Sequence, residues 1–182
     1  MAIDWCEYTA DSIQRWSGGT SQELYIFPRK STVQERNFDV RISTATVEVE
    51  KSTFTDYSGY LRKLLVLEGE LTINHLNHHS VQLKAFEQDF FQGDWHTTSI
   101  GKVRDFNVIY RPYLNPIVEV KTVTSESILL DHSADCFVYV FSGECNINNR
   151  VIATGNAVFC SKNESLLIDT RGNCTIILVR FD

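Results

Sequence analysis

Val66-Leu-Glu-Gly-Glu-Leu-Thr-Ile73 is a short stretch that recurs in the second half of the chain as Val140-Phe-Ser-Gly-Glu-Cys-Asn-Ile147. Four of the eight residues are identical, including the central Gly-Glu pair. Each copy has alternating runs on both sides of a glycine, which takes positive φ at little steric cost, so we predict a hairpin with a tight turn at each Gly-Glu pair. A second similar stretch follows each copy, at residues 83–90 and 152–159. This repetition indicates one β-unit built twice.

Alternation with a period of two continues along the chain. Runs rich in β-branched residues, typical of strands, cover residues 38–49, 61–67, 106–110, 137–141, 166–169 and 175–181. Turn signals separate them at residues 74–80, 93–94, 148–149 and 171–173, and a helix fits only in short pieces, such as residues 11–15. Many short strands with regular turns predict an all-β protein. We expect a double-stranded β-helix, or jelly roll, repeated as two tandem barrels.

The segment at residues 112–116, Pro-Tyr-Leu-Asn-Pro, is the natural connection between these barrels. Proline cannot donate a ladder hydrogen bond, so this segment does not fit inside a central strand. We therefore predict a first barrel at residues 1–114, which includes an N-terminal strand and loop, and a second barrel at residues 115–182.

Composition limits the partners and the compartment. The net charge of −6 argues against nucleic acid, whose phosphates require a basic surface. The sequence has no apolar run of membrane-spanning length and no apolar signal segment at its start, so we expect a cytoplasmic protein that does not bind membranes. The five cysteines are odd in number and form no CxxC pair, which favours buried thiols over a disulfide framework or a structural zinc site.

Polar residues inside the predicted strands are the candidates for a binding site. Alternation places several of them on shared strand faces, and the candidates are Arg41 and Ser43, Arg62, and Asp105, Asn107 and Arg111. If these faces point into the first barrel, the cavity suits a small anionic metabolite, because guanidinium forks match carboxylates in bidentate geometry. The pattern also fits solvated faces, or a structural ion pair between Asp105 and an arginine. The glycine-rich residues 16–23 form either a close-packed turn feeding an edge strand or a loop over the barrel mouth.

The histidines do not show a convergent set of metal ligands. His75, His78 and His79 lie in a polar turn where we expect the rings to face water, and His96 and His132 stand alone. Metal ligands must converge from rigid elements onto one point, so we predict no metal and no cofactor. The sequence has no G-x-S-x-G motif and no Cys, His and acid set marked by spacing. We therefore assign no catalytic residue.

Five motifs in order along the chain carry a resemblance to a known family. The chain is similar to the HutD/Ves family of cupin-like proteins through Trp16-x-Gly-Gly-Thr-x-x-Glu23, Arg41-x-Ser-x-Ala-x-Val47, Phe54-x-x-Tyr-Ser-Gly-Tyr-x-Arg62, Phe91-x-Gly-Asp94 and Asp105-Phe-Asn-x-x-x-Arg111. The resemblance spans nearly the whole chain, with its specific motifs in the first two thirds. It implies a bicupin fold without the usual metal ligands, and the six candidate residues fall on the family's motif positions.

What the resemblance implies about function is a metal-free binding protein. Some members lie beside histidine-utilisation genes, and a role in binding formylglutamate has been suggested; others are described as stress- or cold-associated. We therefore expect the first barrel to bind a small carboxylate, such as an N-formyl or acyl amino acid, and the second to be structural. One alternative is a metal-dependent oxygenase or isomerase that uses His75, His78, His79 or His96 as ligands. Another is an interaction protein with a vestigial pocket, for which sheet edges would allow a homodimer.

Overall fold

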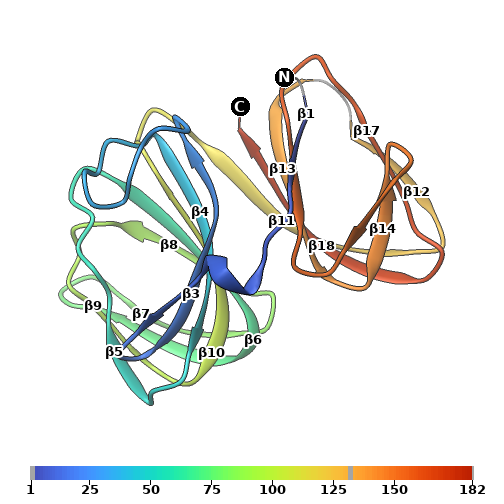
Figure 1. The fold of residues 1–182 in the computed structure, drawn as a ribbon. Helices are drawn as coiled ribbons and strands as arrows, with labels where there is room; N and C mark the ends of the chain where they lie inside the picture. The colour runs from blue at the N-terminus through green and yellow to red at the C-terminus, as the bar shows by residue number, and fades with distance from the viewer. Residues whose placement is uncertain (1–2, 131–132, 182) are drawn as a thin grey trace. The chain divides into compact units, whose positions relative to one another are not determined.

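The computed structural model describes residues 3–130 and 133–181, and within these residues the regular secondary structure is almost entirely β-strand (Figure 1). The described residues contain eighteen strands and one turn of 3-10 helix, which confirms the predicted all-β class. The chain divides into two compact units. Residues 9–113 form the first, here called the first barrel. Residues 114–130 and 133–181, together with residues 3–8, form the second barrel.

The first barrel is built around one long strand. Its elements are η1 (Ala10–Ser12), β2 (Ile13–Trp16), β3 (Gly19–Phe27), β4 (Val40–Val47), β5 (Lys51–Thr53), β6 (Leu61–His75), β7 (Ser80–Lys84), β8 (Gln88–Gln92), β9 (Thr97–Ile100) and β10 (Val103–Tyr110). Among the described residues the strands pair in the order β2-β3-β4-β10-β6-β9-β5. The first part of β6 pairs with β10 and β8, and its last part pairs with β7 and β9. β6 therefore belongs to both faces of the barrel.

The second barrel consists of two sheets among its described residues. Its strands are β1 (Ile3–Cys6), β11 (Pro116–Thr124), β12 (Ser127–Leu130), β13 (Asp135–Ser142), β14 (Glu144–Ile147), β15 (Arg150–Ala153), β16 (Ala157–Cys160), β17 (Leu166–Asp169) and β18 (Asn173–Phe181). One sheet has the order β1-β16-β13-β18-β11, and the other has the order β12-β17-β14-β15.

The N-terminal strand lies in a different place from the one predicted. Sequence analysis groups it with the first barrel, whereas β1 pairs antiparallel with β16 of the second. Its side chains explain the placement, because Ile3 and Trp5 pack against the apolar core of the second barrel. The chain passes between the two units at Tyr8/Thr9 and again at Tyr113/Leu114, inside the proline-flanked segment.

The repeated sequence produces a repeated pattern of strand pairing. β13 and β14 correspond to the two parts of β6, and β15, β16, β17 and β18 make the pairings of β7, β8, β9 and β10. The irregularities repeat as well. The β6–β10 register skips the residue between Val66 and Glu68, and the β13–β18 register skips the residue between Val140 and Ser142.

The Gly-Glu pairs of the repeat are bends rather than hairpin turns, so the hairpin prediction is wrong. Gly69 and Gly143 have φ of 88° and 80°, but the runs on either side of each glycine pair with other strands. A Cβ at Gly69 would lie 2.6 Å from the carbonyl oxygen of Lys102, and one at Gly143 would lie 2.4 Å from that of Asn173. Glycine is therefore needed both for its backbone conformation and for the close approach of a neighbouring strand.

The other turn predictions agree with the structure. Asn148 and Asn149 have φ of 49° and 66° and join β14 to β15, as expected for a two-residue hairpin loop, which needs positive φ at both positions. Residues 76–79 join β6 to β7. In place of the short helix predicted at residues 11–15, the structure has the single 3-10 turn η1, and strand β2 begins at Ile13.

The buried cysteines also agree with the prediction. Cys136, Cys145, Cys160 and Cys174 are free thiols in the apolar core of the second barrel, where burial raises the pKa of each thiol. They act as small core side chains. Among the described residues, no helix has the length and apolar character that a membrane span requires.

Candidate functional site

The first barrel contains a cavity of about 350 Å³. Strands β4, β6 and β10 are adjacent in the sheet and contribute five of the six candidate side chains to its wall, namely Arg41, Ser43, Arg62, Asp105 and Asn107. The strand register brings them together, because Asn107 of β10 lies opposite Ser43 on one side and Leu64 on the other. Adjacent strands and period-two alternation thus place these polar groups around one space.

Arg62 is the most deeply buried cation of this cavity, with an exposed fraction of 7%. Its Nη2 donates to the Oδ1 of Asn107 at 3.1 Å, and its Nη1 donates to the carbonyl oxygen of Thr55 at 3.4 Å. The Nε group has no hydrogen-bond partner among the described residues. A buried donor without a partner is unfavourable by about 1–3 kcal/mol, so this guanidinium has unused hydrogen-bonding capacity.

Aromatic rings surround the same guanidinium. The distance from the Cζ of Arg62 to the ring centroid is 5.0 Å for Phe54, 5.7 Å for Tyr57 and 5.1 Å for Phe91. The negative faces of aromatic rings attract a cation, and the rings hold the long side chain in one orientation. Sequence analysis did not select these three residues, although all of them lie in the quoted motifs.

Asp105 is the buried carboxyl group of the cavity, with an exposed fraction of 4%. Its Oδ1 accepts a hydrogen bond from the Nδ2 of Asn107 at 2.5 Å, so the Asn107 amide bridges Asp105 and Arg62. Burial raises the pKa of Asp105 to about 7, although the nearby Arg62 acts in the opposite direction. Burial also lowers the pKa of Arg62 to about 10, which leaves the guanidinium charged at neutral pH. Asp105 therefore changes its charge near neutrality.

Arg41 is the second cation, and it is held by an ion pair. Its Nε donates to the Oε2 of Glu23 at 3.0 Å, and its Nη1 donates to the Oγ of Ser43 at 3.1 Å. The Arg41 side chain is 13% exposed. Glu23, which lies in the glycine-rich motif, was not among the predicted site residues. These two bonds fix the guanidinium plane of Arg41 at the cavity wall.

The glycine-rich segment, residues 16–23, takes the first of its two predicted roles, a close-packed turn at an edge strand. It forms the edge hairpin of β2 and β3, and Gln14, Arg15 and Trp16 from this hairpin line the cavity. A Cβ on Gly18 would lie 2.0 Å from the ring of Trp16, so the missing side chain lets the indole pack directly on the turn.

Arg111, the sixth candidate, is not among the side chains that line the cavity. β10 ends at Tyr110, so strand alternation no longer fixes the direction of the next side chain. The Arg111 Nη2 donates to the carbonyl oxygen of Arg36 at 3.1 Å, and its Cζ lies 4.1 Å from the ring centroid of Tyr60. These contacts connect loops of the first barrel.

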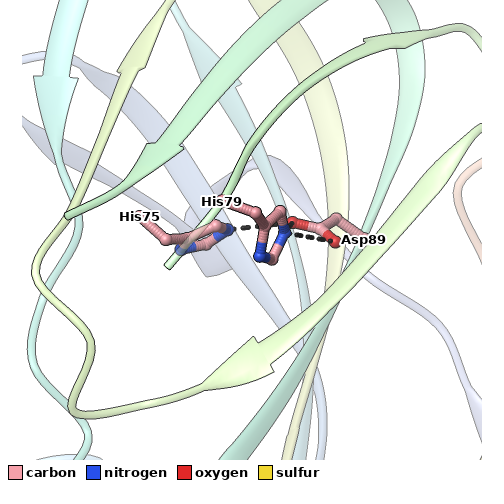
Figure 2. A group of neighbouring side chains, drawn as sticks. All are labelled: His75, His79 and Asp89. Atoms are coloured by element: carbon pink, nitrogen blue, oxygen red, sulfur yellow. Dashed lines mark hydrogen bonds and ion pairs between the residues drawn. The ribbon is translucent and has the colours of Figure 1, made fainter. Parts of the chain in front are cut away.

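A second polar group consists of His75, His79 and Asp89 (Figure 2). The prediction that the histidines face water is wrong for His75, which is 1% exposed, and correct for His78 and His79, which are exposed. The sequence contains a signal for the burial of His75, because Leu71 and Ile73 precede it at alternating inward positions of β6. None of these residues lines the cavity. The cavity wall itself has guanidinium, amide and hydroxyl groups around a single carboxyl group, a set that does not suit a metal cation.

The strand pattern, repeated in two barrels with a cavity in the first, defines an all-β protein of the cupin-like class with two barrels. A model of the HutD family matches residues 9–178. The chain therefore belongs to the HutD family.

Solved structures support the fold over the full length. A conserved protein of unknown function from Pseudomonas aeruginosa PAO1 superposes with a TM-score of 0.80 at 18% identity, over 99% of this chain and 98% of that one. HutD from Pseudomonas fluorescens SBW25 superposes with a TM-score of 0.73 at 21% identity, over 98% of this chain and 99% of that one. The pirin YhhW from Escherichia coli, in complex with nickel(II), gives 0.74 at 11% identity, over 98% of each chain. No curated protein matches the chain by sequence.

Proposed function

We propose that the first barrel binds a small carboxylate metabolite without the help of a metal. The observation that carries the proposal is the buried Arg62, whose Nε lacks a partner among the described residues while the side chain lines a cavity. Buried charges in proteins are normally paired and fully hydrogen-bonded. A ligand carboxylate beside this guanidinium would supply a further acceptor and a full negative charge, which Asp105 supplies only in part because its pKa is raised to about 7.

The other polar groups of the cavity suggest that the ligand carries an amide or a hydroxyl group in addition to its carboxylate. Arg41 adds a second guanidinium to the cavity wall, although its Nε and Nη1 already donate to Glu23 and Ser43. Asp105 and Asn107 are suited to orient an amide or a hydroxyl group, and an N-formyl or other N-acyl amino acid carries both a carboxylate and an amide. The cavity of about 350 Å³ lies at the small end of the range for ligand sites, about 300–1,000 Å³. Formylglutamate is the first candidate, because membership of the HutD family supports a regulatory role in histidine utilisation or in a stress response.

A thermal-shift screen of the untagged protein, followed by calorimetry, tests the proposal. The panel contains small dicarboxylates, formate and N-acyl amino acids, including formylglutamate. A ligand that binds the folded state raises the melting temperature by mass action. Arg41→Ala removes a charged hydrogen bond of about 1.5–3 kcal/mol, so the affinity should fall by about 10- to 100-fold.

Arg111→Ala is the matched control, because it removes an arginine of the same barrel that does not line the cavity. It should leave the affinity unchanged. The proposal is wrong if no anion of the panel raises the melting temperature, or if both arginine variants weaken binding equally.

A further inference from the structure

The cluster of His75, His79 and Asp89 brings three potential ligand atoms to one point at the edge of the first barrel. His75 ends β6, His79 lies in the loop before β7, and Asp89 is on β8. The Nε2 of His75 lies 2.9 Å from the Oδ2 of Asp89, and the Nε2 of His79 lies 3.1 Å from the same oxygen. The three ligand atoms all lie within 4.8 Å of one another. Figure 2 shows both imidazoles directed at the carboxylate.

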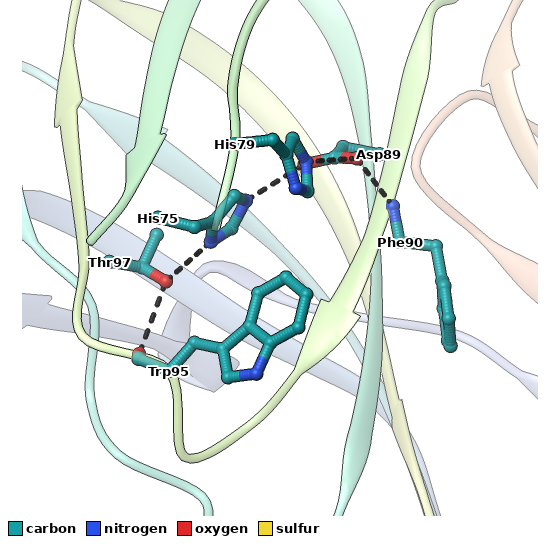
Figure 3. A network of polar contacts seen from close by, with 6 residues as sticks. All are labelled: His75, His79, Asp89, Phe90, Trp95 and Thr97. Carbon is teal, nitrogen blue, oxygen red and sulfur yellow. Dashed lines mark hydrogen bonds and ion pairs between the residues drawn. The ribbon is translucent and has the colours of Figure 1, made fainter. Parts of the chain in front are cut away.

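Hydrogen bonds to neighbouring groups fix the orientation of His75 (Figure 3). Its Nδ1 lies 2.7 Å from the Oγ1 of Thr97, and that hydroxyl donates to the carbonyl oxygen of Trp95 at 3.2 Å. The Thr97 hydroxyl and the Asp89 carboxylate thus contact opposite edges of the imidazole and hold its ring plane in one orientation. In the tautomer that carries its proton on Nδ1, the Nε2 of His75 has a lone pair directed toward Asp89 and can bind a cation there.

The other two ligands are also held in place. The Oδ1 of Asp89 accepts the backbone N–H of Phe90 at 2.9 Å. The loop that carries His79 is closed by backbone hydrogen bonds, from the N–H of His75 to the carbonyl oxygen of His79 at 2.9 Å and from the N–H of His78 to the carbonyl oxygen of His75 at 3.0 Å. The cluster is therefore built on fixed backbone, as a metal site requires.

We propose that His75, His79 and Asp89 form a binding site for a divalent transition metal ion, with Zn²⁺ the favoured ion and water completing its coordination. Two imidazoles and a carboxylate are ligands that Zn²⁺ prefers. Bonds of about 2.0–2.1 Å in a tetrahedral site separate neighbouring ligand atoms by about 3.3 Å. The observed separations of 2.9 and 3.1 Å need to open by only a few tenths of an ångström.

The local surroundings also favour an ion at this place. His79 is 40% exposed, which gives the ion and its water a path from solvent. The ring of His78 is not directed at the carboxylate but stacks on Trp95 at a centroid distance of 3.7 Å.

The site differs in place and in chemistry from the carboxylate cavity. The metal would connect the end of β6, the β6–β7 loop and β8. Phe91 packs against both regions, with its ring centroid 4.4 Å from that of His75 and 5.1 Å from the Cζ of Arg62. The ion would thus stabilise the strands that carry the aromatic wall of the cavity, without contacting the ligand itself.

Metal titration of the untagged, chelator-treated protein tests this inference. We expect calorimetry to give one Zn²⁺ per chain, and Co²⁺ to give the visible absorption of a low-coordinate site with nitrogen and oxygen ligands. Zn²⁺ should also raise the melting temperature, whereas Mg²⁺, which prefers oxygen ligands, should not. His79→Gln and Asp89→Asn should each weaken Zn²⁺ binding by 100-fold or more while leaving carboxylate binding intact.

Two further variants separate this site from adventitious binding. His78→Gln removes the adjacent imidazole and should leave Zn²⁺ affinity unchanged; if it weakens binding as much as His79→Gln, the ion binds a surface histidine pair and the proposal is overturned. Thr97→Val removes the hydroxyl that orients His75 and should weaken binding by about 10- to 100-fold. Absence of Zn²⁺ and Co²⁺ binding to the wild-type protein also overturns the proposal.

Discussion

The two barrels share one pattern of strand pairing, but polar side chains inside the first barrel have apolar counterparts in the second. Asp105 pairs with Val66 in the first barrel, and Ile176 pairs with Val140 at the equivalent place in the second. This register sets the other equivalent positions. The polar side chains of the first barrel and their counterparts are Arg62 and Cys136, Asp105 and Ile176, and Asn107 and Leu178.

The three counterparts in the second barrel are part of its apolar core. A smaller cavity of about 240 Å³ is lined in part by Cys136 and Leu178. In its wall Arg180 pairs with Glu119 at 3.3 Å, and both side chains remain more than a third exposed. The fold is therefore stable without buried charges at these places. Because burying a charge is unfavourable, the polar interior of the first barrel is consistent with the proposal that this barrel binds a ligand.

We expect the largest loss of stability from a substitution that places a charged residue of the first barrel at the equivalent position of the second. Ile176→Asp copies Asp105 but places the carboxylate in an apolar core without Arg62 and Asn107. An uncompensated buried charge should lower the free energy of unfolding by about 4 kcal/mol, measured by urea denaturation at pH 8.

Val151→Asp is the control, because Val151 is exposed on the same barrel and should tolerate the charge within about 0.5 kcal/mol. A loss below 1 kcal/mol for Ile176→Asp would show that the second interior accommodates charge as the first does.

The two repeat glycines should behave alike even though the interiors differ. Gly69→Ala and Gly143→Ala both force a Cβ against a strand carbonyl oxygen at positive φ. Each should lower the free energy of unfolding by about 2–3 kcal/mol. Gly155→Ala, at φ 89° with no atom within 4 Å of the added Cβ, should lower it by only about 1 kcal/mol. A harmless substitution at either repeat glycine would contradict the equivalence of the two bends.

The smallest effect concerns pH and is confined to the first barrel. The pKa of Asp105 is raised to about 7, so its carboxyl group is mostly neutral at pH 6 and mostly ionised at pH 8. An ionised Asp105 repels a bound carboxylate, and the affinity for the anion should therefore be higher at pH 6. If only the neutral form binds, the difference is about tenfold.

Calorimetry of the wild-type protein and of Asp105→Asn at both pH values measures this difference. The variant, which carries no titrating group at this position, should bind equally at pH 6 and pH 8. A wild-type affinity that does not change with pH would remove Asp105 from the recognition of charge.

Much of the fold follows from the sequence because strand alternation and turn residues are local signals. Residues 166–169 were predicted as a strand and form β17, and Asn148-Asn149 forms the predicted hairpin. The Gly69 bend was misread because a glycine with positive φ serves a hairpin turn and a strand bend equally well. Only the partners of the flanking strands distinguish them, and those partners are distant in sequence. The N-terminal strand β1 was assigned to the wrong barrel for the same reason, because its partner strand β16 lies in the other half of the chain.

The candidate site was predictable where strands are regular and unpredictable beyond their ends. Arg41, Ser43 and Asn107 were placed together because alternation fixes the faces of β4 and β10. Arg111 follows the last residue of β10 and is not among the residues that line the cavity. His75 and His79 were named as metal ligands only in the alternative reading. Asp89 was missed because it lies on a neighbouring strand, and no local spacing relates it to the histidines.

The pairing of β1 with β16 makes the second barrel discontinuous in sequence. Because the chain crosses between the units twice, a protease that cuts once near residues 113–114 would produce two fragments, each of which contains part of the second barrel. In the N-terminal fragment, β1 would stay hydrogen-bonded to β16, and Ile3 and Trp5 would stay packed against the apolar core of the second barrel. The nicked protein would then remain one particle under native conditions, and its halves would separate only when the second barrel unfolds.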